Sequence, residues 1–171
     1  GVTEGWRVAA QLAQAGIPVI ASALNDLPAS FEMLGATQSN IGRMKDVGVK
    51  VAIGMINDRD SHQLRYTTQY AGNLVSLESV PNATGLSWDE AFAAISSVPA
   101  DIMGVGDRYG SLKAGRAGDV VIWDGDPLEL SSAPTTVIID GVEQPLANRQ
   151  ARLRDRYARP TEGDLPKAYD R

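Results

Sequence analysis

The sequence predicts an α/β fold class, in which parallel βα units are followed by a smaller β-rich segment. Helix-like and strand-like patterns alternate through residue 105, and both strand-like runs there are continuously apolar. A continuous apolar run is typical of a strand buried on both faces, as in a parallel sheet covered by helices. From Gly110 onward the apolar runs are rich in β-branched residues and are separated by turns. The chain thus changes once from an alternating helix and strand pattern to a β-rich pattern.

The first part alternates helices with two strands, and glycines mark the helix ends. In chain order we expect a helix ending at Gly16, a strand over 17–21, a helix over 39–47, a strand over 49–54, and helices over 62–77 and 88–95. Ser87 and Glu90 stand three residues apart before the last apolar pattern, as in a capping box. The loops after both strands are long and polar, and sites in such folds lie at the carboxyl ends of strands.

The second part is predicted to be β-rich and to end in a helix. We expect strands over 120–123 and 136–139, a two-residue hairpin turn at Asp140-Gly141, a helix over 148–157, and a surface strap or disorder over 158–171. Trp123 is expected in the core of the β segment. Asp124-Gly125-Asp126-Pro127 spaces its carboxylates like a calcium loop, but too few ligands follow, so a turn is favoured.

Composition excludes several classes of function. The 171 residues include 16 Lys and Arg against 21 Asp and Glu, and this net charge of −5 argues against a nucleic-acid partner. The absence of cysteine excludes disulfides, thiolate zinc sites and cysteine nucleophiles. No apolar run reaches the ~18 residues of a membrane span. We expect a soluble chain, with cytoplasmic and periplasmic or secreted locations both open. It begins at Gly1 without an initiator Met, so we expect part of the N-terminus to be missing.

Many short motifs occur along residues 1–157 in one order. They are Trp6-Arg7-Val8-Ala9, Leu27-Pro28-Ala29-Ser30-Phe31, Asp60-Ser61-His62-Gln63-Leu64-Arg65, Gly85-Leu86-Ser87-Trp88-Asp89-Glu90 and Asp124-Gly125-Asp126-Pro127-Leu128-Glu129. In this order they resemble the C-terminal part of metal-dependent amidohydrolases, and specifically the imidazolonepropionase-like branch of that superfamily. The resemblance implies the terminal βα units of a TIM-like (β/α)8 barrel plus strands of a small β-sandwich. We accordingly expect a barrel part over 1–107, a β-sandwich segment over 108–147, and a C-terminal helix and tail over 148–171.

The resemblance also implies a reaction, which is metal-assisted hydrolysis of a non-peptide C–N bond in a cyclic amide or dipeptide-like small molecule. The family barrel holds one or two divalent metals, commonly zinc, and its ligands include an Asp after strand eight. Asp60 is the candidate for that ligand and for the catalytic proton shuttle, and it also suits a helix N-cap. Asp58 is the alternative, because it lies closer to the strand end. His62 and Arg65 are candidates for substrate binding; a surface histidine and an ion pair of Arg65 with Asp58 or Asp60 remain open.

The loop after the first strand offers further candidates. Ser30 and Glu32 could face a substrate, whereas the segment Leu27–Phe31 is expected to pack as a plug.

The loop after the second strand departs from the family pattern. Gly54-Met55-Ile56-Asn57 stands where the family has Gly-Thr-Asp or Gly-Ser-Asp directly after strand eight. This departure keeps a second hypothesis open, namely a non-catalytic amidohydrolase-like module for binding or assembly.

The chain supplies too little for a complete site. It contains one histidine, and two parallel strands are about a quarter of a barrel, which takes ~200 residues or more. We therefore expect the N-terminal remainder of the barrel to come from the same or a separate chain, and the 171 residues alone to be inactive. A homo-oligomer is also possible.

Overall fold

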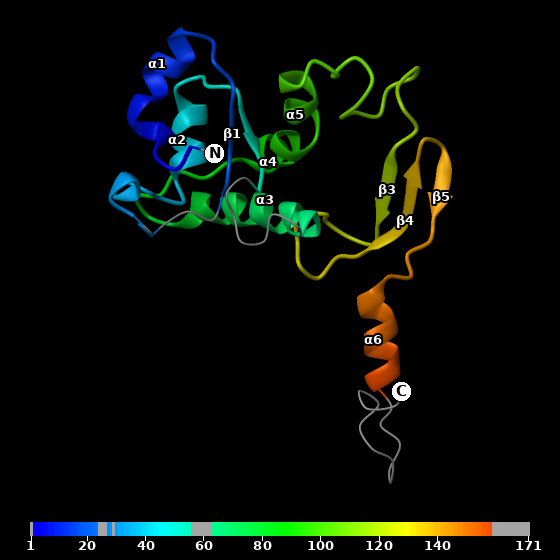
Figure 1. The fold of residues 1–171 in the computed structure, drawn as a ribbon. Helices are drawn as coiled ribbons and strands as arrows, with labels where there is room; N and C mark the ends of the chain where they lie inside the picture. Colours follow the sequence, from blue (N-terminus) through cyan, green and yellow to red (C-terminus); the bar gives the residue numbers. More distant parts are fainter. Residues whose placement is uncertain (1, 24–26, 29, 56–62, 159–171) are drawn as a thin grey trace.

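The computed structural model describes residues 2–23, 27–28, 30–55 and 63–158. Figure 1 shows a helical part that surrounds two strands, a separate three-stranded sheet, and a helix that extends away from both. The elements, in chain order, are η1 (Gly5–Val8), α1 (Ala9–Gln14), β1 (Val19–Ala21), η2 (Phe31–Met33), α2 (Asn40–Asp46), β2 (Val51–Ile53), η3 (Leu64–Tyr66), α3 (Thr67–Ser76), η4 (Leu77–Ser79), α4 (Trp88–Ile95), α5 (Ser97–Ile102), β3 (Val120–Trp123), β4 (Pro134–Ile139), β5 (Val142–Gln144) and α6 (Arg149–Tyr157), where η denotes a 3-10 turn.

The two apolar runs form a parallel pair of strands, as predicted. β1 pairs with β2 in the register Val19↔Val51 to Ala21↔Ile53. All three residues of β2 are buried, because α2, α3, α4 and α5 all contact this strand. Both strands are shorter than the apolar runs that predicted them. Gly16 ends α1 in the left-handed region with φ 63°, which confirms it as the predicted helix stop.

The helix beginnings follow local signals to different degrees. α4 has the predicted bounds, and its capping box is complete: the Ser87 hydroxyl accepts from the Glu90 amide, and the Glu90 carboxylate accepts from the Ser87 amide. Glu90 also pairs with Lys45 of α2, with 2.8 Å between Nζ and Oε1. These bonds lower the pKa of Glu90 to about 2, with the Lys45 hydrogen bond as the largest cause. The helix predicted over 62–77 begins as the turn η3 and becomes α-helical only at Thr67.

Three glycines let backbones touch within the helical part. A Cβ at Gly42 of α2 would overlap the carbonyl oxygen of Thr84, and one at Gly85 would overlap that of Leu74. A Cβ at Gly72 of α3 would overlap the carbonyl oxygen of Leu128. Because each overlap involves backbone, it cannot be relieved by rotating a side chain. The fully buried Ile41, Met44 and Leu74 lie one or two residues from these contacts.

The β-rich segment forms one antiparallel sheet in the order β3-β4-β5. The hairpin turn between β4 and β5 is confirmed, since Asp140 and Gly141 both take positive φ, 51° and 76°. The expectation that Trp123 lies in a β core is wrong: its side chain is half-buried. A single sheet has no second layer to cover it within the described residues, so a strand residue can be shielded on one side only.

The segment after β3 attaches the sheet to the helices. Asp126 accepts hydrogen bonds from the Trp88 indole nitrogen at 2.8 and 3.0 Å and from the Leu128 amide at 2.8 Å. The Leu128 side chain is buried in the helical core. Asp124 accepts from the Ala133 amide at 2.7 Å. The two carboxylates therefore fix a turn. This agrees with the sequence analysis, which favoured a turn and not a calcium loop for this segment.

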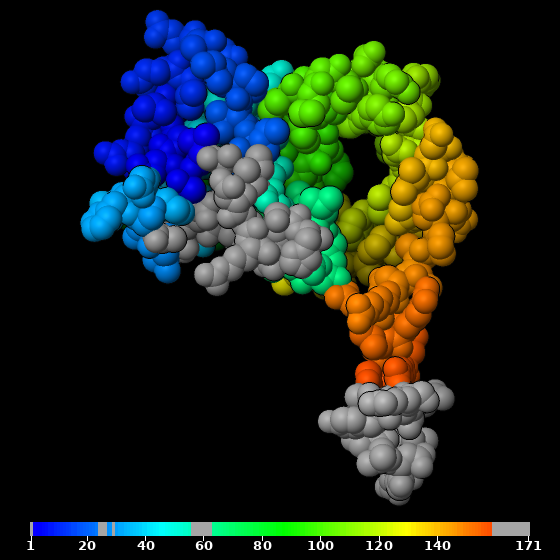
Figure 2. All heavy atoms as spheres, in the orientation of Figure 1, coloured from blue at the N-terminus to red at the C-terminus, as the bar shows by residue number. Residues whose placement is uncertain are grey.

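Helix α6 extends beyond the rest of the described chain (Figure 1). Asn148 caps it by accepting from the Ala151 amide at 2.9 Å. Every residue of α6 is at least partly exposed. Figure 2 also shows the molecule hollowed between the helical part and the sheet.

Within the described part of the chain, no helix combines the length and the apolar composition needed to span a membrane.

The contact of Gly72 with Leu128 predicts that replacing this helical glycine by alanine destabilises the protein, which is the reverse of the usual effect. In an ordinary helix, Gly→Ala stabilises, because alanine is the better helix former. Gly72→Ala should instead lower the free energy of unfolding by about 1–3 kcal/mol, since the new methyl group meets the Leu128 carbonyl. Urea unfolding followed by circular dichroism measures this. The control is Asn73→Ala, an exposed neighbour on the same helix, which should change stability by no more than about 0.5 kcal/mol. Equal stability of both variants would contradict the contact.

The Glu90 bonds predict a pH-dependent contribution to stability. Glu90→Gln keeps a capping side chain but loses the charge, whereas Glu90→Ala loses both, so we expect losses of about 0.5 and about 1 kcal/mol at pH 7. Because the folded pKa is lowered to about 2, the wild-type advantage should be full above about pH 4.5 and vanish as pH falls towards 2. Thermal unfolding across pH 2–7 checks this. Asp89→Asn, on the same first turn but exposed, is the control; a pH-independent Glu90→Gln difference would contradict the assignment.

Candidate functional site

The carboxyl ends of β1 and β2 lie side by side and define the candidate site. The Gly54 amide, directly after β2, donates to the Ala21 carbonyl at the end of β1 at 2.9 Å. The chain then leaves both strands from buried positions, at Ser22 and Met55. Parallel α/β sheets place their functional groups at this edge, because the loops of several strands converge there. We call this edge the strand-end site.

Asp60, Asp58 and His62 lie outside the described residues. The described chain leaves the strand-end site at Met55 and resumes at Gln63, just before η3. Their assignment as metal ligand, proton shuttle and substrate contact stays a prediction.

Arg65 is described, and it is held by neighbours that the sequence did not indicate. Its guanidinium lies 4.9 Å from the ring centre of Tyr66, and Nη2 donates to the Tyr66 hydroxyl at 3.0 Å. Nη1 donates to the side-chain oxygen of Gln150 in α6. A substrate carboxylate at Arg65 would therefore compete with Gln150. The partners are 85 residues apart, so no local pattern could have revealed this contact.

The loop after β1 is exposed where it was expected to be packed. Leu27 is 75% exposed and Phe31 is 88% exposed, so the predicted plug is wrong. The segment forms only the single turn η2, and the described residues place no layer over its apolar side chains. Ser30 and Glu32 interact with each other: a hydrogen bond from Ser30 lowers the pKa of the Glu32 carboxyl. Their polar groups are thereby engaged locally.

The described residues do not by themselves offer a set of ligands that fits a divalent metal. Among the described residues, no three His, Cys, Asp or Glu side chains gather closely enough to hold an ion. The sequence contains a single histidine and no cysteine. Structural and catalytic zinc sites require three or four such ligands.

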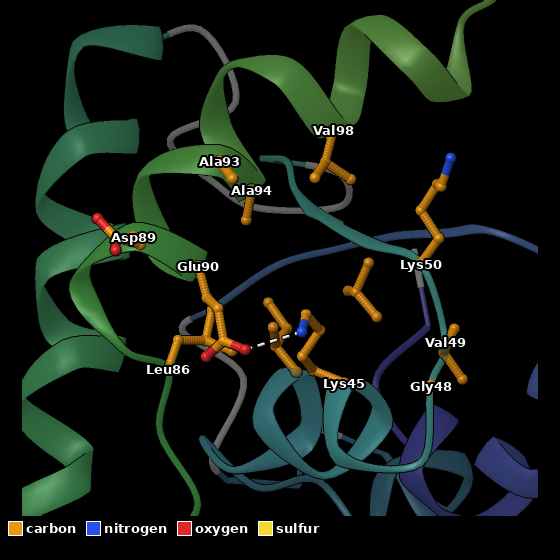
Figure 3. Close-up of a pocket in the computed structure, with 12 residues that line it drawn as sticks. Lys45, Gly48, Val49, Lys50, Leu86, Asp89, Glu90, Ala93, Ala94 and Val98 are labelled. Carbon is orange, nitrogen blue, oxygen red and sulfur yellow. Dashed lines mark hydrogen bonds and ion pairs between the residues drawn. The ribbon is translucent and has the colours of Figure 1, made fainter.

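Two cavities lie elsewhere. One of about 460 Å³ sits at the opposite, amino end of β2, between α2 and α4, and the Lys45–Glu90 pair lies in its wall (Figure 3). Its lining is mostly aliphatic, with Ile41, Val49, Leu86 and Val98. Because this end of a parallel sheet is opposite to the usual functional edge, we assign the cavity to packing.

The second cavity, of about 480 Å³, lies between α4 and β3. Its wall includes three aromatic side chains, Phe92, Tyr109 and Trp123. Arg65, Ser30 and Glu32 line neither of these two cavities. Ser30 instead lines a smaller cavity of about 230 Å³, together with Pro28, Phe31 and Leu34 of the loop after β1.

Solved structures share this fold. An amidohydrolase from Thermotoga maritima MSB8 superposes with a TM-score of 0.71 and 28% identity, over 82% of this chain and 34% of that one. A triazine hydrolase variant superposes with a TM-score of 0.58 and 20% identity, over 90% of this chain and 38% of that one. The predicted α/β fold class, with its relation to amidohydrolase TIM-barrel enzymes, is confirmed. The chain spans about a third of the length of these structures.

Sequence comparison likewise relates this chain to amidohydrolases. Amidohydrolase tasK from Hapsidospora irregularis is 47% identical over 60 residues, which is 35% of this chain and 6% of that protein. The model of the "Amidohydrolase family" matches residues 3–146, which include both sheets but not α6. The chain belongs to the amidohydrolase family.

Proposed function

We propose that this chain is the C-terminal part of a metal-dependent hydrolase of the imidazolonepropionase-like branch, which cleaves a non-peptide C–N bond in a cyclic amide or dipeptide-like substrate. The observation that carries the proposal is the parallel pair β1-β2, whose adjacent carboxyl ends form a strand-end site in a chain spanning about a third of its structural relatives. Enzymes of the amidohydrolase family generally use divalent metals.

The free edge of β2 supports the view that more of the barrel is needed. Within the described residues β2 pairs only with β1. The bonds from the Val19 amide to the Lys50 carbonyl and from the Gly54 amide to the Ala21 carbonyl fix the parallel pattern. In that pattern alternate residues bond to opposite sides, so Val51 and Ile53 direct their backbone groups towards the other edge. Both are buried, and buried backbone groups need partners, which a further strand would supply.

In this proposal Asp60 supplies the chain's own chemistry at the strand-end site. Its carboxylate accepts a proton from the attacking water and returns it to the departing nitrogen, as general base and then general acid. His62 and Arg65 bind the substrate, and for Arg65 this means exchanging Gln150 for a substrate carboxylate. The remaining metal ligands come from the N-terminal remainder of the barrel, in the same or a separate chain.

The division of the chain follows the same proposal. Residues 1–107 contribute to the barrel, 108–147 contribute one sheet of a β-sandwich, and 148–171 form the C-terminal helix and tail. The side chains of Val120, Ile122 and Ile138 share one face of the β3-β4-β5 sheet by register, and this is the face suited to a second sheet.

A non-catalytic, amidohydrolase-like binding or assembly module is the second candidate. It is favoured by the residues Gly54-Met55 directly after β2, which depart from the Gly-Thr-Asp or Gly-Ser-Asp of the family resemblance. In that case the longer protein would bind no catalytic metal, and its carboxylates after β2 would be dispensable.

The role of Asp60 can be tested against its neighbour. In the longer protein that contains this chain, Asp60→Asn should lower kcat about 10²–10⁴-fold, because the proton transfer is lost. Asp58→Asn is the matched control and should leave kcat within a few fold. Hydrolysis is measured on a panel of cyclic amides and N-acyl amino acids. The reverse pattern would assign the role to Asp58, and equal turnover by all three proteins would contradict a catalytic role for either carboxylate. No turnover by the wild type or by either variant would favour the non-catalytic module.

The incompleteness of the site predicts the behaviour of the isolated chain. The 171 residues, incubated with zinc and desalted, should retain well below one ion per chain by elemental analysis and should not turn over the same panel. Adding the separately expressed N-terminal remainder should restore both. Stoichiometric zinc with turnover by the isolated chain would contradict the proposal.

A further inference from the structure

The guanidinium of Arg65 has neutral partners among the described residues. Nη1 donates to the side-chain oxygen of Gln150, Nη2 donates to the Tyr66 hydroxyl, and the group lies over the Tyr66 ring. The ion pairs found within the described residues do not include Arg65, and Asp58 and Asp60 lie outside them. A guanidinium binds a carboxylate through charge-assisted, often paired hydrogen bonds, which are stronger than a bond to a neutral amide. A ligand carboxylate is therefore a better acceptor for Arg65 than Gln150 is.

The two sides of the contact between Arg65 and Gln150 are anchored unequally. The neighbouring Tyr66 packs against the helical core, and η3 continues directly into α3. Gln150 belongs to α6, which extends away from the rest of the described chain and has every residue at least partly exposed (Figure 1). Residues 145–148, which connect α6 to β5, contain neither helix nor strand. A helix of nine residues is marginally stable alone in water. Loss of the contact would therefore release α6 and leave Arg65 in place.

Helix α6 brings positive charge to the neighbourhood of Arg65. Its nine residues include four arginines and one aspartate, a net charge of +3 in a chain whose net charge is −5. The aspartate, Asp155, pairs with the adjacent Arg154 at 2.8 Å. Because Gln150 in the first turn of α6 bonds to Arg65, this basic helix begins beside the guanidinium. A local gathering of one sign of charge attracts ligands of the opposite sign. The surroundings of Arg65 thus favour an anionic ligand.

We propose that α6 is a movable cover of Arg65, and that a small molecule with a free carboxylate displaces it. Gln150 occupies the guanidinium in the free protein; the carboxylate takes its place, and α6 moves away about residues 145–148. This inference rests on the proposed function, because it takes Arg65 as a substrate-binding residue. Within that function it selects N-acyl amino acids and dipeptide-like substrates over neutral cyclic amides. The family match ends at residue 146, so the cover lies outside the part of the chain that defines the family.

The cover predicts changes in KM that depend on substrate charge, because apparent affinity falls with the fraction of protein that is uncovered. The longer protein that contains this chain is assayed on N-acetyl amino acids and on their neutral C-terminal amides. Gln150→Ala should lower KM for the acids about threefold, and Gln150→Glu should raise it at least about tenfold. The kcat values and KM for the amides should stay unchanged. Gln11→Glu, with the same change in charge at an exposed position of α1, is the control.

Removal of the guanidinium tests whether Gln150 acts through Arg65. Arg65→Ala should raise KM for the acids and should make both Gln150 substitutions ineffective when they are combined with it. Equal effects of the Gln150 substitutions on acids and amides, or effects that persist without Arg65, would overturn the cover.

A second experiment does not depend on turnover, because trypsin cleaves after arginines and cleaves a frayed helix faster than a held one. N-acetylglycine should accelerate tryptic cleavage within 149–157 of the longer protein at least about threefold over sodium chloride of equal ionic strength. Its neutral amide, N-acetylglycinamide, should have no effect. Gln150→Ala should be cleaved at the fast rate without ligand. Mass spectrometry of the fragments identifies the cleaved bonds.

The two experiments separate the cover from the proposed function. Carboxylate-dependent cleavage of α6 by a protein that hydrolyses none of the substrates would support the cover and contradict the hydrolase. Hydrolysis by a protein whose α6 is cleaved equally fast with N-acetylglycine, with its amide and with sodium chloride would support the hydrolase and overturn the cover.

Discussion

The packing of the helical part depends on three places where backbone meets backbone with no room for a Cβ. Gly42 lies against the Thr84 carbonyl, Gly85 against that of Leu74, and Gly72 against that of Leu128. These contacts set how closely α2, α3 and the incoming segments approach one another. Because interiors are close-packed, small displacements there would spread to the buried strands between the helices. The short pair β1-β2 is held by this surrounding shell more than by its own few hydrogen bonds.

Two carboxylate side chains add hydrogen bonds between the elements packed in this way. The Glu90 carboxylate joins the first turn of α4 to Lys45 of α2, and the Asp126 carboxylate joins the turn after β3 to Trp88 of α4. Both acids therefore connect α4 to a different element. Helix α4 thus links the parallel pair on one side to the antiparallel sheet on the other, and the strand-end site lies in the half that α4 stabilises.

Features fixed by local chemistry could be predicted from the sequence, and features fixed by distant contacts could not. The capping box at Ser87, the left-handed stop at Gly16 and the Asp140-Gly141 turn depend on a few neighbouring residues, and all three were predicted correctly. The burial of Trp123 and of Phe31 depends on which layer lies above them, and both predictions were wrong. The Arg65–Gln150 contact joins segments far apart in sequence and left no local pattern. The candidates Asp60 and His62 stay predictions.

The three tryptophans give each part of this molecule its own optical probe. Trp6 lies beneath the Arg43 guanidinium in the first helices, and Trp123 belongs to β3. Trp88 stands between them, stacked on Phe92 with ring centres 5.1 Å apart while its indole nitrogen bonds to Asp126. Separation of the sheet from the helices would break that bond and expose the ring to water. In a variant that keeps only Trp88, the near-ultraviolet spectrum therefore distinguishes a detached sheet from a melted helical part.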